Sequence, residues 1–262
     1  MNFKTISTQL LYVTMPIWVK SNNNKENSFG TGFLFNYLTK EKASIPFIVT
    51  NFHVINEGHS VITEFLKSKD NEPCRQDKIK VEIGLSRHDI FGNKDNDLYL
   101  IPLGPVMHDI RKTGTEIFLR GVDQSMIPDV KVVNELSALE EIIFIGYPEQ
   151  IYDSKNILPI VRRGITATPI WNDFNDKKKF LIDAGVYPGS SGSPVFIFNQ
   201  GTYAVKDGIA LGDRLLFIGV LSEASISTQE ENNKCFLGLG SVIKTEILIN
   251  FIDSVVKQLK IE

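Results

Sequence analysis

Ser191 stands between glycines, in a turn that joins two apolar segments of the chain. Residues 180–182 precede this turn and residues 195–198 follow it, which predicts a strand on each side. Acyl transfer needs an exposed hydroxyl and N–H donors aimed at the developing oxyanion, and glycines let a carbonyl approach the backbone closely. We therefore interpret Ser191 as a nucleophile, with the N–H groups of Gly189 and Ser191 as the oxyanion hole. The alternative is a flexible turn, which Gly-Ser segments between strands commonly form.

A nucleophilic serine needs a general base and a group that orients the base. Of the four histidines, His53 follows the apolar segment 47–50, at the end of a predicted strand, where a rigid scaffold commonly places catalytic residues. A packed core histidine is the alternative interpretation. Asp97 precedes the apolar segment 98–103 and is the candidate orienting group, although an aspartate in such a polar cluster commonly serves as a turn residue. The rivals for the orienting role are Asp89 and Asp95.

The chain order His53, Asp97, Ser191 is that of the chymotrypsin class and differs from the orders of subtilisin and the α/β-hydrolases. Motifs at and between these residues follow one another along the chain: Gly30-Thr31-Gly32-Phe33, Val49-Thr50-Asn51-Phe52-His53-Val54-Ile55, Asn96-Asp97-Leu98-Tyr99-Leu100-Ile101, Ile145-Gly146-Tyr147-Pro148, Gly189-Ser190-Ser191-Gly192-Ser193-Pro194 and Gly219-Val220-Leu221-Ser222. Together they resemble the trypsin-like serine peptidases of the chymotrypsin fold. The resemblance is closest to their cysteine-poor bacterial branch, which includes the HtrA-type peptidase domain.

The resemblance implies a role for each motif residue. His53 takes the proton from Ser191 and later gives it to the leaving amine, while Asp97 holds the imidazole and stabilises its charged form. Ser222 is expected to hydrogen-bond Asp97. Residues Ser222–Ala224 are expected to pair with the substrate backbone as an added strand.

Two departures from the secreted trypsins bear on activation. Ser190 stands where those enzymes have an aspartate, and the chain lacks their Ile-Val-Gly-Gly start. In those enzymes a freed N-terminus pairs with that aspartate and shapes the oxyanion hole. We therefore do not expect activation by N-terminal cleavage, and predict a site that is preformed or ordered by a partner or substrate.

The resemblance also implies the walls of a specificity pocket. Gly185 replaces the acid that would select Arg or Lys, which predicts a small or medium apolar residue at P1, the residue whose carbonyl is attacked. The substrate-binding residues expected from the resemblance are Gly185, Val186, Tyr187, Pro188, Leu221, Ser222, Glu223 and Ala224.

Many short strand-like segments separated by turn signals predict an all-β architecture. With the resemblance, we expect a single unit over residues 1–262 with two six-stranded antiparallel Greek-key β-barrels, of about residues 9–130 and 137–243. The segment 11–19 is predicted to be a strand and the polar stretch 67–78 an exposed loop. The helical spacing of apolar residues over Thr245–Leu259 predicts a C-terminal α-helix within about residues 244–260.

Composition limits the partners. The 262 residues are 42% hydrophobic and 23% charged with a net charge of −3, which is ordinary for a globular protein and indicates neither nucleic-acid nor membrane binding. The N-terminal segment has polar residues and a proline and is not expected to be a secretory signal. The chain has only two cysteines, so we expect reduced thiols and a cytoplasmic protein. The histidines lack metal-ligand spacing, so neither metal nor cofactor is expected.

The sequence therefore predicts a serine endopeptidase with the triad His53, Asp97 and Ser191, acting on a protein or peptide substrate. We hypothesise that it processes one dedicated protein partner. The main alternative is a catalytically silent, peptide-binding pseudopeptidase on the same fold, against which the intact triad residues argue. An esterase is the third reading, and the chain order and the lack of an α/β pattern argue against it.

Overall fold

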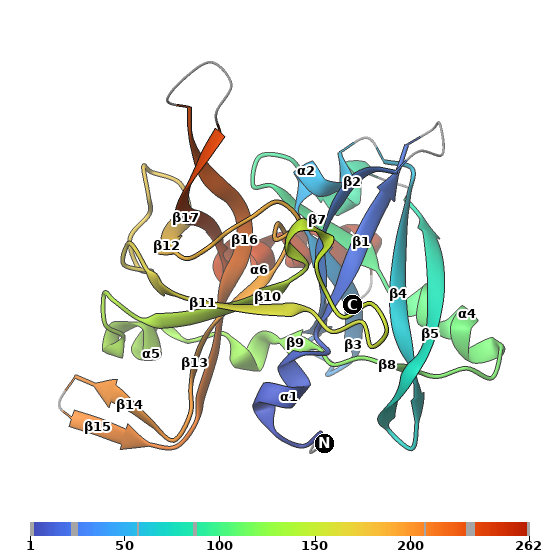
Figure 1. The fold of residues 1–262 in the computed structure, drawn as a ribbon, viewed down its shortest axis with the longest axis horizontal. Helices are drawn as coiled ribbons and strands as arrows, with labels where there is room; N and C mark the ends of the chain where they lie inside the picture. The colour runs from blue at the N-terminus through green and yellow to red at the C-terminus, as the bar shows by residue number, and fades with distance from the viewer. Residues whose placement is uncertain are drawn as a thin grey trace.

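Two β-structures from opposite halves of the chain pack against each other in the computed structural model (Figure 1). The structure describes residues 3–21, 26–56, 58–85, 88–206, 208–228 and 234–260. Side chains are described for all of these except residues 26, 27, 88, 224–228 and 234–236. The all-β fold class predicted from the sequence is confirmed.

The N-terminal half forms a nine-stranded sheet of order β5-β4-β1-β2-β3-β7-β6, with β8 paired to β4 and β9 paired to β2. The resemblance implied a six-stranded barrel here. The described residues instead form an open sheet, in which β6, β8 and β9 are short additions to six longer strands. The strands are β1 (Thr14–Lys20), β2 (Glu26–Leu38), β3 (Ser44–Thr50), β4 (Ser60–Lys69), β5 (Glu72–Gly84), β6 (Gly92–Asn93), β7 (Leu98–Pro102), β8 (Ile117–Phe118) and β9 (Val122–Asp123).

Two local predictions in this half were wrong. The segment 11–19 is not all strand, because helix α1 (Ile6–Leu10) ends there and β1 begins only at Thr14. The polar stretch 67–78 is not a loop, because β4 and β5 continue through it to a tight turn at Asp70 and Asn71, with φ of 53° and 59°. Asp and Asn tolerate this left-handed conformation better than most residues. Charged side chains along that hairpin pair across the strands, as Lys67 does with Asp77.

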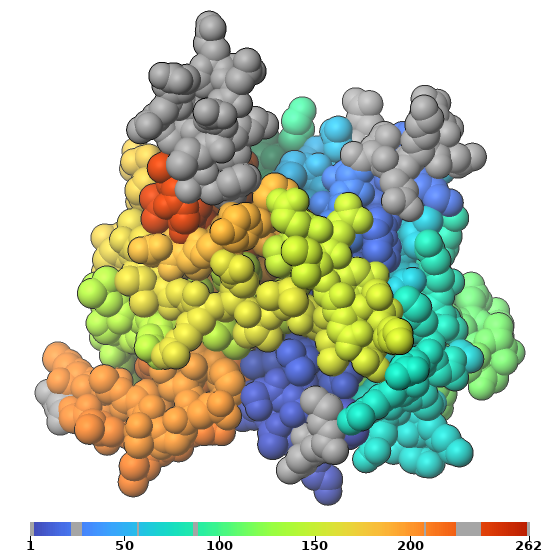
Figure 2. All heavy atoms as spheres, in the orientation of Figure 1, coloured from blue at the N-terminus to red at the C-terminus, as the bar shows by residue number. Residues whose placement is uncertain are grey.

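The C-terminal half is a closed barrel of order β10-β11-β12-β17-β16-β13, which confirms the predicted six-stranded barrel. A separate hairpin, which the sequence analysis did not predict, projects from one corner of the molecule (Figure 2). The barrel strands are β10 (Glu141–Gly146), β11 (Ile160–Thr166), β12 (Lys179–Asp183), β13 (Pro194–Asn199), β16 (Arg214–Thr228) and β17 (Lys234–Lys244), and the hairpin strands are β14 (Thr202–Val205) and β15 (Gly208–Leu211).

Short helices occupy the connections. They are α2 (Phe52–Ile55), α3 (His88–Phe91), α4 (Gly104–Lys112), α5 (Val130–Glu135) and the 3₁₀ turns Gln124–Met126 and Pro148–Gln150. Helix α4 was not predicted from the sequence; it is nine residues long and has no fully buried residue. Among the described residues, no helix is both long enough and apolar enough to cross a membrane.

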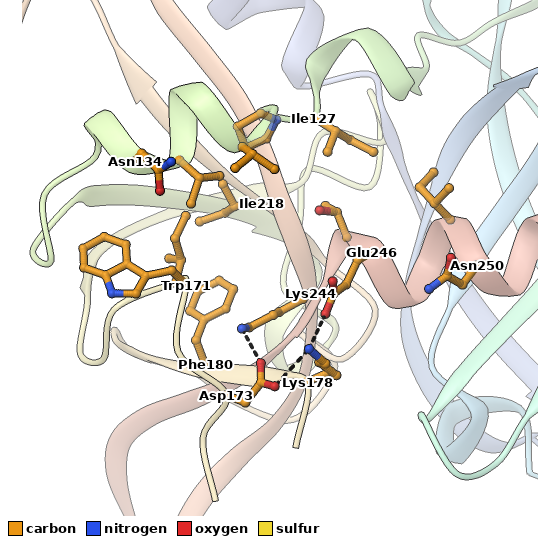
Figure 3. Close-up of a pocket in the computed structure, with 16 residues that line it drawn as sticks. Ile127, Asn134, Trp171, Asp173, Lys178, Phe180, Ile218, Lys244, Glu246 and Asn250 are labelled. Atoms are coloured by element: carbon orange, nitrogen blue, oxygen red, sulfur yellow. Dashed lines mark hydrogen bonds and ion pairs between the residues drawn. The ribbon is translucent and has the colours of Figure 1, made fainter. Parts of the chain in front are cut away.

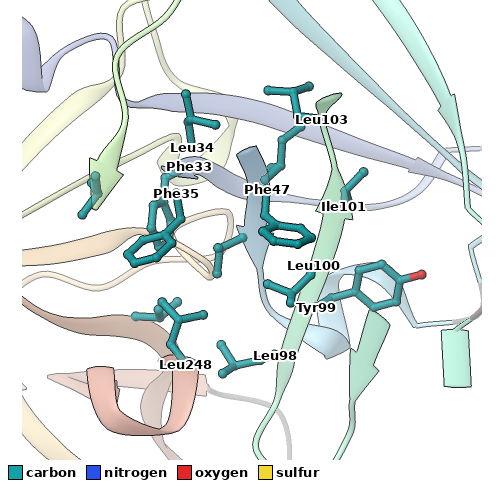
Figure 4. Packing of buried hydrophobic residues seen from close by; sticks show 14 of the residues in the cluster. Phe33, Leu34, Phe35, Phe47, Leu98, Tyr99, Leu100, Ile101, Leu103 and Leu248 are labelled. Carbon is teal, nitrogen blue, oxygen red and sulfur yellow. The ribbon is translucent and has the colours of Figure 1, made fainter. Parts of the chain in front are cut away.

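The C-terminal helix α6 spans Thr245–Leu259, as its apolar periodicity predicted. Its buried side chains recur at helical spacing, at Leu248, Phe251, Ile252 and Val255. They join one apolar core that combines residues of the N-terminal sheet, such as Phe35 and Leu98, with residues of the C-terminal barrel (Figure 4). The hydroxyl of Tyr37 on β2 donates to Asp253 of the helix at 2.6 Å, and burial together with this bond raises the pKa of Tyr37 to about 12. The helix therefore fastens the two halves together.

Candidate active site

His53 and Asp97 meet at the edge of the N-terminal sheet. His53 is the second residue of α2, the short helix that follows β3. Asp97 directly precedes β7, the strand beside β3. The pairing of Thr50 with Tyr99 fixes the register of these strands and so brings their ends together. Nδ1 of His53 lies 2.9 Å from Oδ2 and 3.0 Å from Oδ1 of Asp97. The backbone N–H of His53 also donates to Oδ1, at 2.9 Å.

The surroundings keep Asp97 ionised. Burial raises the pKa of this carboxyl, but the hydrogen bonds and charge of His53, together with the hydroxyl of Ser222, outweigh burial and hold the pKa below its ordinary value of 3.8. Ser222 donates to Oδ2 at 2.6 Å. The side chain of Asp97 is 14% exposed and that of His53 is 45% exposed. The imidazole therefore has its orienting carboxylate on a shielded side and its remaining ring edge accessible.

Asn51 fixes the backbone at Asp97. Asp97 adopts a left-handed conformation with φ of 55°, which a short polar side chain tolerates. The fully buried Asn51 donates from Nδ2 to the carbonyl oxygen of Asp97 at 2.9 Å. Asn51 belongs to the histidine motif, but the sequence analysis gave it no role. A buried asparagine two residues before His53 is the signal that could have identified it.

The loop that carries Ser191 exposes alternate amides. Three amides of this loop are paired: Ser190 N with Tyr187 O (3.0 Å), Gly192 N with Leu221 O (2.8 Å) and Ser193 N with Ser190 O (3.0 Å). Among the described residues, the amides of Gly189 and Ser191 have no acceptor. The carbonyl of Pro188 accepts from the amide of Glu149 at 2.7 Å, so the Gly189 N–H on the other side of that planar peptide points away from Glu149. Two N–H donors are thus left available beside the Ser191 hydroxyl.

Thr31 on β2 anchors this loop from the other half of the chain. Its amide donates to the carbonyl of Ser191 at 2.9 Å, and its Oγ1 donates to the carbonyl of Gly189 at 2.8 Å. The same Oγ1 accepts from the amide of Tyr147 at 3.1 Å. Sequence reasoning quoted Thr31 within a motif but assigned it no function. The two glycines that flank it are the available signal, because a Cβ at Gly30 would lie 3.3 Å from Ser191 O.

The hydroxyl of Ser191 donates to the backbone carbonyl of Ser222 at 2.9 Å. Ser222 therefore contacts both halves of the site, since its own hydroxyl binds Asp97. This arrangement places a serine hydroxyl, an oriented imidazole and two available amides together at the junction of the N-terminal sheet and the C-terminal barrel. These are the groups that acyl transfer requires.

Comparison with known proteins agrees with this chemistry. Residues 30–203 match the family model of the trypsin-like peptidase domain. The chain belongs to the trypsin-like peptidase family. It is therefore a hydrolase of the serine endopeptidase class. None of the curated proteins matches the sequence.

A solved structure shares the fold of this peptidase. The crystal structure of the serine endoprotease from Yersinia pestis is similar over 97% of this chain and 67% of that chain, with a TM-score of 0.53 and 15% sequence identity. At this identity the likeness shows the fold alone.

The predicted pocket walls of the peptidase divide into two kinds. Val186 and Leu221 are 3% and 0% exposed and pack into the barrel core, so their side chains cannot face a substrate. Gly185 lies against the guanidinium of Arg162, which sequence reasoning did not consider. Accessible surface is retained by Tyr187, Pro188 and Glu223. Ser222 is fully buried, and the side chain of Ala224 lies outside the described residues.

A separate cavity of about 600 Å³ lies between α5, the start of α6 and the loop around Asp173 (Figure 3). None of the triad residues lines it. Asp173 accepts from Lys244 at 2.6 Å and pairs with Lys178 at 3.0 Å, and Lys178 also pairs with Glu246. The hydrogen bonds from Lys244 and Lys178 lower the pKa of Asp173. The lining contains no histidine, serine or cysteine, and its carboxylates Asp173 and Glu246 are held by Lys178 and Lys244.

Proposed function

We propose that the protein hydrolyses peptide bonds through an acyl-enzyme on Ser191, with His53 as general base and acid and Asp97 as the orienting carboxylate. The observation that carries this proposal is the continuous set of contacts from His53 through Asp97 and Ser222 to the Ser191 hydroxyl. Such a set is what an activated nucleophile requires, and a packed core histidine would not need it.

The reaction begins when the Ser191 side chain turns from the Ser222 carbonyl toward Nε2 of His53. Oγ then attacks the substrate carbonyl carbon while its proton passes to Nε2. The oxyanion accepts hydrogen bonds from the amides of Gly189 and Ser191, which have no acceptor among the described residues. His53 gives the proton to the leaving amine as the C–N bond breaks. A water molecule then attacks the acyl carbonyl while its proton passes to Nε2, and His53 returns that proton to Ser191 Oγ as the acid product leaves.

The substrate backbone is proposed to align along Ser222–Ala224 in β16. The carbonyl of Ser222 already faces the nucleophile, because the Ser191 hydroxyl donates to it. An extended peptide that adds to this segment would bring its scissile carbonyl beside the two amides. This mode of binding suits an endopeptidase, since nothing in it requires a chain terminus.

A peptide-binding pseudopeptidase is the second candidate. It is favoured by one observation, namely that the Ser191 hydroxyl is bonded to Ser222 O and not to His53. Hydrogen bonds of apo active sites often tighten only when substrate binds, so the peptidase proposal is consistent with the same geometry.

Labelling with a fluorophosphonate probe, followed by mass spectrometry of the labelled peptide, tests the two candidates. We expect the purified protein to be labelled at Ser191 and labelling to disappear in Ser191→Ala and His53→Ala. Matched controls are Ser154→Ala and His108→Ala, since both residues are exposed and lie outside the site. A folded protein that stays unlabelled, alone and with peptide or lysate added, would establish the pseudopeptidase.

The cytoplasmic location and the dedicated protein partner are part of the proposal. The location rests on the scarcity of cysteine in the sequence. The dedicated partner is a hypothesis for a peptidase of this size. Cell fractionation tests the first. A proteome-wide cleavage survey with Ser191→Ala as the control tests the second, and many unrelated substrates would contradict it.

A further inference from the structure

We propose that Arg162 forms the base of the P1 pocket and selects a substrate with an aspartate or glutamate at P1. This inference rests on the proposed function, because it assigns a specificity to the same site. It replaces the small or medium apolar residue that Gly185 alone predicted.

The guanidinium of Arg162 occupies the space that a side chain at Gly185 would take. A Cβ built at Gly185 would lie 1.8 Å from Nη2 and 3.0 Å from Cζ of Arg162. Gly185 is a predicted wall residue, so the guanidinium lies beside the predicted pocket. A larger residue at this position would displace the guanidinium, which is the end of a flexible side chain.

The strand period explains how Arg162 reaches the pocket. Along β11, Val161 and Ile165 face solvent with 45% and 41% exposure, so Arg162 and Gly164 face the other side. A Cβ at Gly164 would meet Ala184, which shows that this side of the strand faces the segment leading to Gly185. Arg162 therefore points from the barrel wall toward the predicted pocket.

Tyr187, another predicted wall residue, holds the guanidinium in place. Cζ of Arg162 lies 5.2 Å from the centre of the Tyr187 ring, within the range of a cation–π interaction. Such stacking fixes the plane of the guanidinium and leaves its N–H groups free to point elsewhere.

The charge of Arg162 has no acidic partner among the described residues. Two other arginines of this barrel are paired with acids, Arg163 with Glu141 and Arg214 with Glu140. A guanidinium is always protonated and matches a carboxylate in a bidentate geometry. A half-buried, unneutralised guanidinium on a pocket wall favours a substrate carboxylate and repels a substrate lysine or arginine.

The test compares internally quenched peptides that differ only at P1, with Glu, Asp, Gln, Val or Lys. Gln is the neutral match for Glu. We expect kcat/KM for Glu to exceed that for Gln by about 10- to 100-fold, the effect of one charged hydrogen-bonded pair. In Arg162→Gln the Glu-to-Gln ratio is expected to fall to about one, and in Arg162→Glu Lys is expected to become the preferred residue.

Arg163→Gln is the matched control. It removes the same charge from the next residue of β11, whose side chain is 70% exposed and faces away from the pocket. The wild-type ratio should persist in it. A wild-type preference for Val over Glu, or a ratio that Arg162→Gln leaves unchanged, would overturn the proposal.

Two further measurements separate this inference from the proposed function. Fluorophosphonate labelling reports the nucleophile without a P1 residue, so a labelled protein that does not prefer Glu refutes only the role of Arg162. Binding of the uncleaved Glu and Gln peptides to Ser191→Ala, measured by fluorescence anisotropy, reports the pocket without catalysis. Tighter binding of Glu supports Arg162 even if the protein proves unlabelled, and equal binding contradicts it.

Discussion

The two halves of the chain hold their parts of the site by different means. In the N-terminal half, His53 and Asp97 stand at the ends of two paired strands and bond directly to each other. In the C-terminal barrel, Ser191 lies on an irregular loop whose carbonyls are held by Thr31, a residue of the opposite half. One part is positioned by strand register within a sheet and the other by contacts between the halves. The pair of His53 and Asp97 can therefore form locally, whereas the loop of Ser191 requires the two halves to be packed.

The largest expected effect concerns the first half. Asp97→Asn should lower kcat/KM by on the order of 10⁴-fold, because the amide cannot hold the imidazole in the required tautomer. Steady-state cleavage of the preferred peptide measures it. Asp95→Asn is the control, because Asp95 is exposed and lies in the same turn. A larger loss in Asp95→Asn than in Asp97→Asn would show that Asp95, and not Asp97, orients the imidazole.

The next effect concerns the loop. Gly192 has φ of 88°, and a Cβ there would lie 2.0 Å from Thr31 O and 2.7 Å from Thr50 Oγ1. Gly192→Ala should lower the free energy of unfolding by about 3–5 kcal/mol. Gly201→Ala is matched in backbone, with φ of 81°, but meets nothing within 4 Å, so it should lose only about 1–2 kcal/mol. Equal losses of unfolding free energy for the two variants, measured by urea denaturation, would show that the close contact between Gly192 and the N-terminal half does not contribute to stability.

A smaller effect is expected when the contact between the halves loses its hydroxyl. Thr31→Val leaves the carbonyl of Gly189 and the amide of Tyr147 without their partner, which should reduce stability by about 2–3 kcal/mol and lower kcat more than it raises KM. Thr63→Val is the control, because Thr63 is fully buried and its hydroxyl has no partner among the described residues. If both variants behave alike, Thr31 does not position the loop.

The smallest expected effect is a difference in pH dependence between the stability contributed by Asp97 and that contributed by Thr31. The pKa of Asp97 lies below 3.8 in the folded protein, so its contribution to stability is complete above that value and is lost as the pH falls through the folded pKa. The stability difference between the wild type and Asp97→Asn should therefore shrink below about pH 3.8. The difference between the wild type and Thr31→Val should stay constant, because neutral groups make those bonds. Denaturation curves between neutral pH and pH 3 provide the comparison.

The same contrast explains what the sequence could predict. Strand periodicity was sufficient for the all-β class and helix α6, because these depend on local patterns of apolar residues. The closed barrel was expected from the resemblance that the ordered motifs carry. Candidate residues such as His53 and Asp97 could be named because each follows or precedes an apolar strand. The hairpin turn at Asp70 and Asn71 was missed because the polar residues around it suggested a loop.

The missed residues act between elements that are distant in sequence. Thr31 contacts the nucleophile loop from the other half, and Arg162 meets Gly185 across two neighbouring strands. No local pattern marks either contact. Asn51 is a partial exception, because a polar residue within the histidine motif suggests a structural role. Strand pairings and packed interfaces, which a single sequence does not display, decide these positions.

Helix α6 also has a consequence for biosynthesis. It follows every strand that the structure describes, yet it supplies Leu248 and Ile252 to the core shared with the N-terminal sheet. While the chain emerges from the ribosome, that sheet lacks its apolar cover, and the bond between Tyr37 and Asp253 cannot form. The loop of Ser191 needs the packed halves, so proteolytic competence should appear only after the helix is released. A nascent chain would thus carry the residues of its proposed triad for some time without being able to cleave its neighbours.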